Sequence, residues 1–173
     1  MRLAPLLLVL LLCGCFAGKP FYTAAQSQPV MPPGFYAVSM IDDGHRKHGR
    51  ARVTIVEGTL ERIEVTGDKP NTIGLKSVGG GRFVVWDQGS DPLKLDADEI
   101  AYAMLEQRGE GRFRLSMLMC DAYRDAAVAA GATVQESPKG SHCRFERAEQ
   151  LEAAIRSIKP TEVGAADLRF LHA

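Results

Sequence analysis

Between residues 35 and 87 the chain contains short segments rich in Val, Ile and aromatic residues, and in some of them apolar residues alternate with polar ones. In 50–56, for example, Ala51, Val53 and Ile55 fall on one face of an extended chain, and the intervening residues are polar. Period-two alternation of this kind is typical of a strand with one buried side. Gly, Asp, Asn and Pro separate the segments, and such short connections predict antiparallel pairing of neighbours. The predicted β-meander has five strands, at residues 35–41, 50–56, 61–66, 72–78 and 82–87.

The pattern changes after residue 95. Asp96 and Glu99 form a capping-box arrangement before residues 97–108, where Ile100, Ala103 and Met104 follow helical spacing, so this segment is expected to be a helix. Residues 112–120 alternate, with Phe113, Leu115, Met117 and Met119 on one side, and predict a strand. Further helices are expected at 122–130, after Asp121, and at 147–158, with a hairpin between them and a short last strand in 167–173.

Strands followed by helices predict an α+β fold. We therefore expect one domain, residues 35–173, in which the antiparallel meander is followed by a β/α segment with three helices. The helices would form a single layer on one face of the sheet.

The start of the chain differs from this domain. Residues 3–17 are almost entirely apolar and follow Arg2, but the run is shorter than the roughly 20 residues that a transmembrane helix needs. A positive start, an apolar centre and small residues at the end are typical of a secretory signal. Its last residues, Leu12-Cys13-Gly14-Cys15, resemble the lipobox of bacterial lipoproteins.

The resemblance implies that residues 1–14 are removed and that the thiol of Cys15 carries a diacylglyceryl group. Phe16 follows instead of Asp, which by the same resemblance favours the outer membrane over the inner one. Residues 15–34 are rich in Pro, Gln, Ser and Ala and are expected to be a flexible tether. Plain secretion with cleavage near Thr23, and a retained anchor, are the alternatives.

The four cysteines have different expected fates if the lipobox is used. Cys13 leaves with the signal and Cys15 is acylated, which leaves Cys120 and Cys143 in an oxidising compartment. A disulfide between them is the natural pairing. Free buried thiols, or a metal or redox role involving the neighbouring Asp121 and His142, are the alternatives.

Charge is balanced, with 21 Lys and Arg against 21 Asp and Glu, so the whole chain has no field that would attract nucleic acid. The densest polar cluster is at residues 42–52, where Asp42, Asp43, His45 and His48 could hold a metal, although a hairpin tip would hold such ligands poorly. The same segment carries a basic patch suited to an envelope protein or anionic lipid: His45, Arg46, Lys47, His48, Arg50 and Arg52.

The sequence contains no complete catalytic, cofactor-binding or metal-binding motif, and we predict no catalytic, cofactor or metal site. The expected function is that of a lipid-anchored, periplasm-facing envelope protein acting as a non-enzymatic binding or structural module. A lipocalin-like carrier is the alternative, with an apolar pocket lined by Phe35, Trp86 and Met117. An enzyme would require His45 and His142 to converge with a carboxylate in a cleft.

Overall fold

The computed structural model of the protein describes residues 15–42, 44–88, 94–96, 99–137, 140–160 and 164–171. The predicted signal, residues 1–14, and Asp43 lie outside the described residues.

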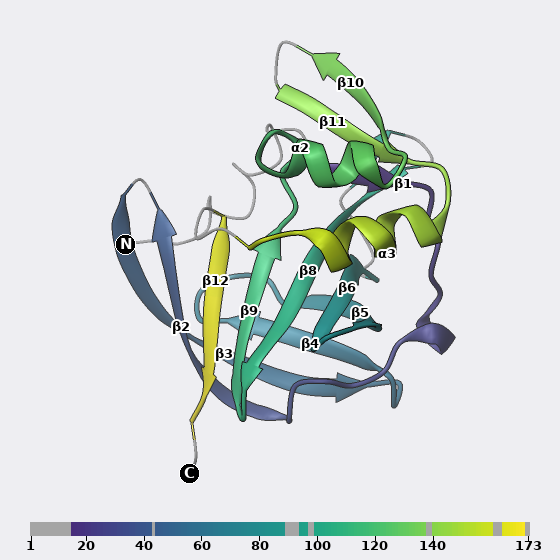
Figure 1. The fold of residues 1–173 in the computed structure, drawn as a ribbon. Helices are drawn as coiled ribbons and strands as arrows, with labels where there is room; N and C mark the ends of the chain where they lie inside the picture. The colour runs from purple at the N-terminus through teal and green to yellow at the C-terminus, as the bar shows by residue number, and fades with distance from the viewer. Residues whose placement is uncertain are drawn as a thin grey trace.

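Eight antiparallel strands form a closed barrel (Figure 1). Each strand pairs with the next barrel strand along the chain, and the last, β12, pairs with both β9 and β2 and so closes the barrel. This arrangement is an up-and-down barrel. Its strands are β2 (Gly34–Asp42), β3 (His45–Val56), β4 (Leu60–Val65), β5 (Asn71–Gly79), β6 (Arg82–Asp87), β8 (Glu99–Gly109), β9 (Arg112–Met117) and β12 (Ala165–Phe170).

Side chains occupy the barrel interior. Alternate residues of each strand point inward, and those of an eight-stranded barrel can fill it. Tyr36, Phe83 and Phe113 contribute aromatic rings that are at least nine-tenths buried. They belong to one apolar cluster: Met31, Tyr36, Val38, Ala51, Val53, Ile73, Leu75, Phe83, Val85, Leu105, Phe113 and Leu168.

A second core lies between the barrel wall and the α-helices of the described residues. The helices α2 (Cys120–Ala129) and α3 (Ala148–Ser157) are drawn outside the barrel in Figure 1. Beside them lie β1 (Phe16–Gly18) and the hairpin β10 (Thr133–Ser137) and β11 (Gly140–Phe145), while β7 (Lys94–Asp96) pairs with β8. Outward-facing residues of β6 and β8, among them Trp86 and Tyr102, pack with Leu151 and Ile155 of α3 in this core.

The α+β expectation is wrong, because the meander continues past its fifth strand and closes into a barrel. The five predicted strands are present as β2 to β6, and the helices expected at 122–130 and 147–158 are α2 and α3. The short strand expected within 167–173 is β12, which supplies the closure. Short segments rich in Val, Ile and aromatic residues between turn residues identified the strands, but these signals carried no information on closure.

The helix expected at 97–108 is a strand, β8. Ala103 and Leu105 face the barrel interior, whereas Tyr102 and Met104 face the helices, so both sides of this strand are buried. A strand buried on both sides loses its polar positions, and its continuous apolar run imitates a helical spacing.

Residues 16–31, expected to belong to a flexible tether, pack against the domain. Phe16 is fully buried in β1, which pairs in parallel with β11 and antiparallel with β8. Tyr22 lies 5.0 Å from the ring of Trp86, and the hydroxyl of Tyr102 donates to the carbonyl of Lys19. This segment is therefore held on the domain by aromatic and backbone contacts, although its Pro and Gln content had indicated a solvent-exposed tether.

One end of the barrel is covered by residues 27–31. The hydroxyl of Ser27 accepts from the amide of Leu75, and Met31 enters the interior core. Both Val30 and Met31 donate their amides to Oε1 of Glu61, a fully buried residue of β4. Burial raises the pKa of Glu61, and these two hydrogen bonds oppose that rise only in part.

The Cys120–Cys143 disulfide is present, as predicted. It joins the first residue of α2 to β11, and both cysteines are fully buried. The disulfide therefore links α2 covalently to the β10–β11 hairpin, and neither of these elements is part of the barrel. Within the described part of the chain, neither helix has the length and apolar character needed to cross a bilayer.

Candidate functional site: the arginine face

Outward-facing side chains of β3, β2, β12 and β9, together with Arg108 near the end of β8, form a surface rich in arginine. The helices pack on other strands of the barrel and leave this surface uncovered. We call it the arginine face and define it by the guanidinium-bearing residues on it, together with His48: Arg46, His48, Arg50, Arg52, Arg108, Arg112, Arg114 and Arg169.

Strand register brings these residues together from three separate parts of the sequence, 46–52, 108–114 and Arg169. Ala37 on β2 pairs with Arg50 on one side and Arg169 on the other. Arg169 then pairs with Arg112 on β9. The result is a row of three arginines across the sheet, interrupted only by one small side chain.

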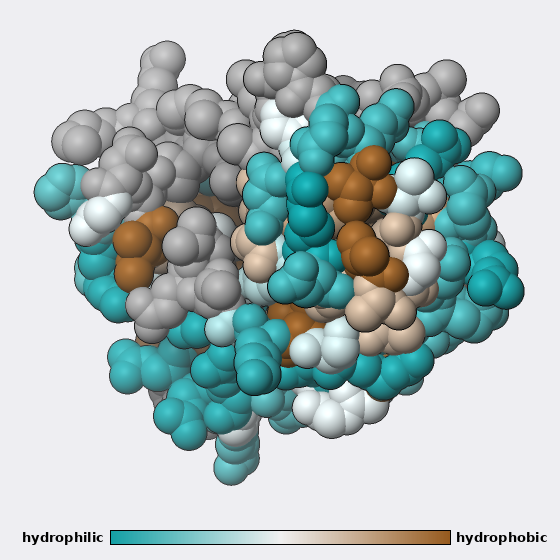
Figure 2. All heavy atoms as spheres, turned by 45° about the horizontal axis from the view of Figure 1, so that its top comes forward, coloured by the Kyte–Doolittle hydropathy of each residue, from teal (hydrophilic) through white to brown (hydrophobic). Residues whose placement is uncertain are grey.

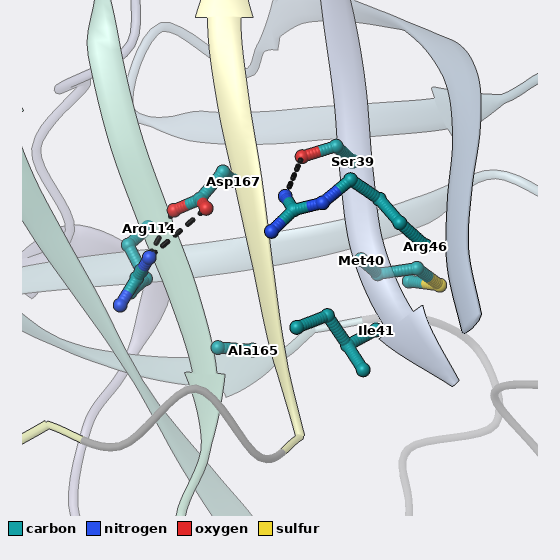
Figure 3. A pocket seen from close by; sticks show the side chains of 7 residues that line it. All are labelled: Ser39, Met40, Ile41, Arg46, Arg114, Ala165 and Asp167. Carbon is teal, nitrogen blue, oxygen red and sulfur yellow. Dashed lines mark hydrogen bonds and ion pairs between the residues drawn. The ribbon is translucent and has the colours of Figure 1, made fainter. Parts of the chain in front are cut away.

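Asp167 on β12 places a carboxylate among these arginines. Arg114 makes a two-pronged ion pair with Asp167, at 2.7 Å from Nε to Oδ1 and 2.9 Å from the second nitrogen to Oδ2. Figure 3 shows this pair over β9 and β12, with Arg46 reaching from β3 to the hydroxyl of Ser39. The pKa of Asp167 is lowered, first by the hydrogen bond from Arg114 and further by the positive charges of Arg108 and Arg46.

The face retains positive charge after this pairing. Arg108 contacts Glu106. Among the described residues, no ion pair involves Arg50, Arg112 or Arg169, and all three are exposed. Because the whole chain is neutral, this surface is a local concentration of charge.

Small residues form the floor of an open hollow in this face. Its volume is about 420 Å³, and Ala37 and Ser39 lie between the longer side chains around it. Most of the lining residues point outward from the sheet, so the hollow is outside the barrel. Its lining comprises Ala37, Val38, Ser39, His48, Arg108, Arg112, Phe113, Asp167, Leu168 and Arg169.

Two exposed apolar side chains flank the hollow along β2. Phe35 is 57% exposed and Ile41 is 37% exposed, and Arg52 lies over the ring of Phe35 at 5.9 Å from its centre. In Figure 2, with the top of Figure 1 turned forward, the coloured surface is mostly hydrophilic, with apolar groups gathered near its centre. Val128 on α2 is the third exposed large apolar residue among those described.

The structure divides the basic patch expected at 45–52. Arg46, His48, Arg50 and Arg52 share the outer face of β3, whereas Lys47 is on the opposite side of that strand. His45 is exposed at the start of β3, beside the hairpin tip. The sequence showed no reason to group Arg112, Arg114 and Arg169 with them, because only barrel closure places β9 and β12 beside β2.

Other expected constellations do not assemble. Among the described residues, no group of three His, Cys, Asp or Glu side chains could hold a metal. His142 lies on β11 and His45 on β3, in different parts of the fold. The carrier pocket is not formed as expected either: Phe35 is outside, Trp86 lies in the core under the helices, and Met117 faces the barrel interior.

Comparison with known proteins gives one short similarity. The chain is 40% identical over 52 residues to the cysteine–tRNA ligase of Cutibacterium acnes, a match that covers 30% of this chain and 11% of that protein. This stretch is much shorter than the barrel, which spans Gly34 to Phe170. No family model matches the chain, and no solved structure matches it.

Proposed function

We propose that this protein is a non-enzymatic binding module that contacts an anionic partner through the arginine face. The observation that carries the proposal is the row formed by Arg50, Arg169 and Arg112 on a surface without helices. Guanidinium groups recognise phosphate and carboxylate in a two-pronged geometry. Arg114 and Asp167 already show that geometry within the face.

Packed side chains fill the barrel interior, which supports a binding site on the outer surface of the barrel. Tyr36, Phe83 and Phe113 place rings among the aliphatic residues of the inner cluster, and Met31 closes one end. A ligand inside would have to displace packed apolar side chains, at a cost similar to that of overpacking a core.

A lipid on Cys15 is proposed as the attachment to the cell envelope. Its support is the lipobox-like sequence before Cys15. The side chain of Cys15 is 2% exposed, so acylation requires it to leave this buried position. Because Phe16 is held in β1, a lipid there would attach the domain with almost no tether, at the periplasmic surface of a membrane.

Retention on phosphocellulose tests the anionic-partner proposal. A neutral protein binds a phosphate-bearing matrix only through a local positive surface. The double variant Arg50→Glu/Arg169→Glu should elute at clearly lower salt than the unchanged protein. Lys19→Glu/Lys159→Glu is the matched control, since it makes the same charge change at exposed residues near β1 and α3. Equal shifts in both variants would contradict a localised site.

The lipid proposal has its own test. Cys15→Ser should abolish palmitate labelling in cells and move the protein from the membrane fraction to the soluble fraction. Labelling that persists in this variant would reject Cys15 as the acylated residue.

A lipocalin-like carrier remains the second candidate because eight-stranded up-and-down barrels include ligand carriers. A carrier should bind a lipophilic fluorescent probe with one-to-one stoichiometry, and Val53→Trp, in the interior, should block that binding. The binding-module proposal predicts no such stoichiometric binding.

A further inference from the structure

We infer that the arginine face docks flat on an anionic phospholipid membrane, with its arginines on the lipid phosphates and Phe35 and Ile41 in the interfacial region. This inference rests on the proposed function, because it names the partner of the same face. It assigns the partner to a lipid surface and not to an acidic protein. Three observations lead to that choice.

The first observation is the placement of exposed apolar residues. Two of the three large apolar side chains exposed among the described residues, Phe35 and Ile41, belong to this one face. They lie on the same outer side of β2, six residues and about 20 Å apart. A basic surface that also exposes apolar side chains fits the membrane interface, where charge and apolar burial act together.

The second observation is the shape of the face. Between Phe35 and Ile41 the outward residues of β2 are Ala37 and Ser39, both small. Arginines from β3 stand on one side of them, and Arg169 and Arg112 stand on the other. Headgroup phosphates can therefore approach the row from above without a bulky side chain between the arginines.

The third observation is the position of the proposed lipid attachment. Phe16, which directly follows Cys15, donates its amide to the carbonyl of Leu118, just beyond the end of β9. At that end of the barrel the amide of Met117 donates to the carbonyl of Gly164, and β12 begins at Ala165, near the Ile41 end of β2. A lipid on Cys15 would thus enter the membrane at the same end of the barrel as Ile41.

A tryptophan placed at Phe35 reports on this contact directly. The full-length variant Phe35→Trp is mixed with vesicles that contain phosphatidylglycerol and phosphatidylcholine with brominated chains, and quenching of its emission is measured. Val128→Trp is the matched control, because it adds an indole at the exposed apolar residue of α2, a helix packed on β10, β11 and α3. The native Trp86 is 1% exposed and gives the constant background.

We expect quenching of Phe35→Trp in anionic vesicles and little in pure phosphatidylcholine, with Val128→Trp unquenched in both. Adding Arg50→Glu/Arg169→Glu to Phe35→Trp should weaken the quenching response to anionic lipid more than tenfold in lipid concentration. Equal quenching of the two tryptophans, or none at residue 35, would overturn the inference. If phosphocellulose retention persists while quenching is absent, the face binds anions but the partner is not a membrane.

Discussion

Arg112 on β9 and Arg169 on β12 are direct cross-strand partners on the outside of the barrel, so two like charges lie side by side. Like charges in this position destabilise a sheet. Retaining the pair therefore lowers stability, which is consistent with a surface that binds an anion.

Arg112→Gln should raise the free energy of unfolding by a few tenths of a kcal/mol at low salt, because it removes this repulsion. Urea unfolding at low and at about 1 M salt measures the effect, which should fade as the charges are screened. Arg62→Gln is the control, since Arg62 faces outward from β4 opposite Thr54. A gain of the same size at Arg62 would show that repulsion at Arg112 is not the cause.

Replacing both Cys120 and Cys143 by Ala should lower the free energy of unfolding by about 3 kcal/mol, because the bridge closes a loop of 23 residues. Unfolding of the unchanged protein in reducing agent should give a similar loss. If reduction left the urea midpoint unchanged, the disulfide would have no role in holding α2 and β11 together.

Stability should also depend on the protonation of Glu61. Its pKa is raised in the folded protein, so the folded state holds a proton more tightly than the unfolded chain does. The tighter binding of this proton adds to the free energy of unfolding. That contribution is fully present below the unfolded pKa of 4.5 and is lost as the pH rises through the folded pKa. As the pH rises through the folded pKa, the unchanged protein should therefore lose stability relative to Glu61→Gln, whose residue 61 does not titrate. Urea unfolding at a series of pH values measures it, and a pH-independent difference would contradict the raised pKa.

Gly74 lies opposite Trp86 on the neighbouring strand, and a Cβ atom there would come within 2.2 Å of the indole ring. Gly74→Ala should thus cost about 1–3 kcal/mol through overpacking. Gly49→Ala is the control, because a Cβ at Gly49 meets nothing within 4 Å. Equal melting temperatures for the two variants would show that the indole of Trp86 moves aside without cost.

The sequence located strands where short runs rich in Val, Ile and aromatic residues end at turn-forming residues. These signals located β2 to β6, including β6, which is buried on both faces, and cysteine parity identified the disulfide. The sequence misled at β8, where Tyr102 and Leu105 are buried on opposite faces and no polar period remains. Closure could not be predicted, since it depends on β12 pairing with two strands that are distant in sequence.

The candidate site was predicted in part for the same reason. Arg46, Arg50 and Arg52 are close in sequence and were recognisable as a basic patch. Arg112 and Arg169 are more than 50 residues away from them in the sequence, so only the strand register brings these side chains together. Lys47 was grouped with the patch because proximity in sequence does not distinguish the two faces of β3.

Amide chemical shifts recorded during titration with a soluble short-chain phosphatidylglycerol, kept below its micelle concentration, test the central claim most directly. Binding on the outside predicts shifts around Ala37, Arg50 and Arg169, with interior residues such as Val53 and Leu75 unaffected. Shifts concentrated at Val53 and Leu75, or their absence from the arginine face, would contradict the account.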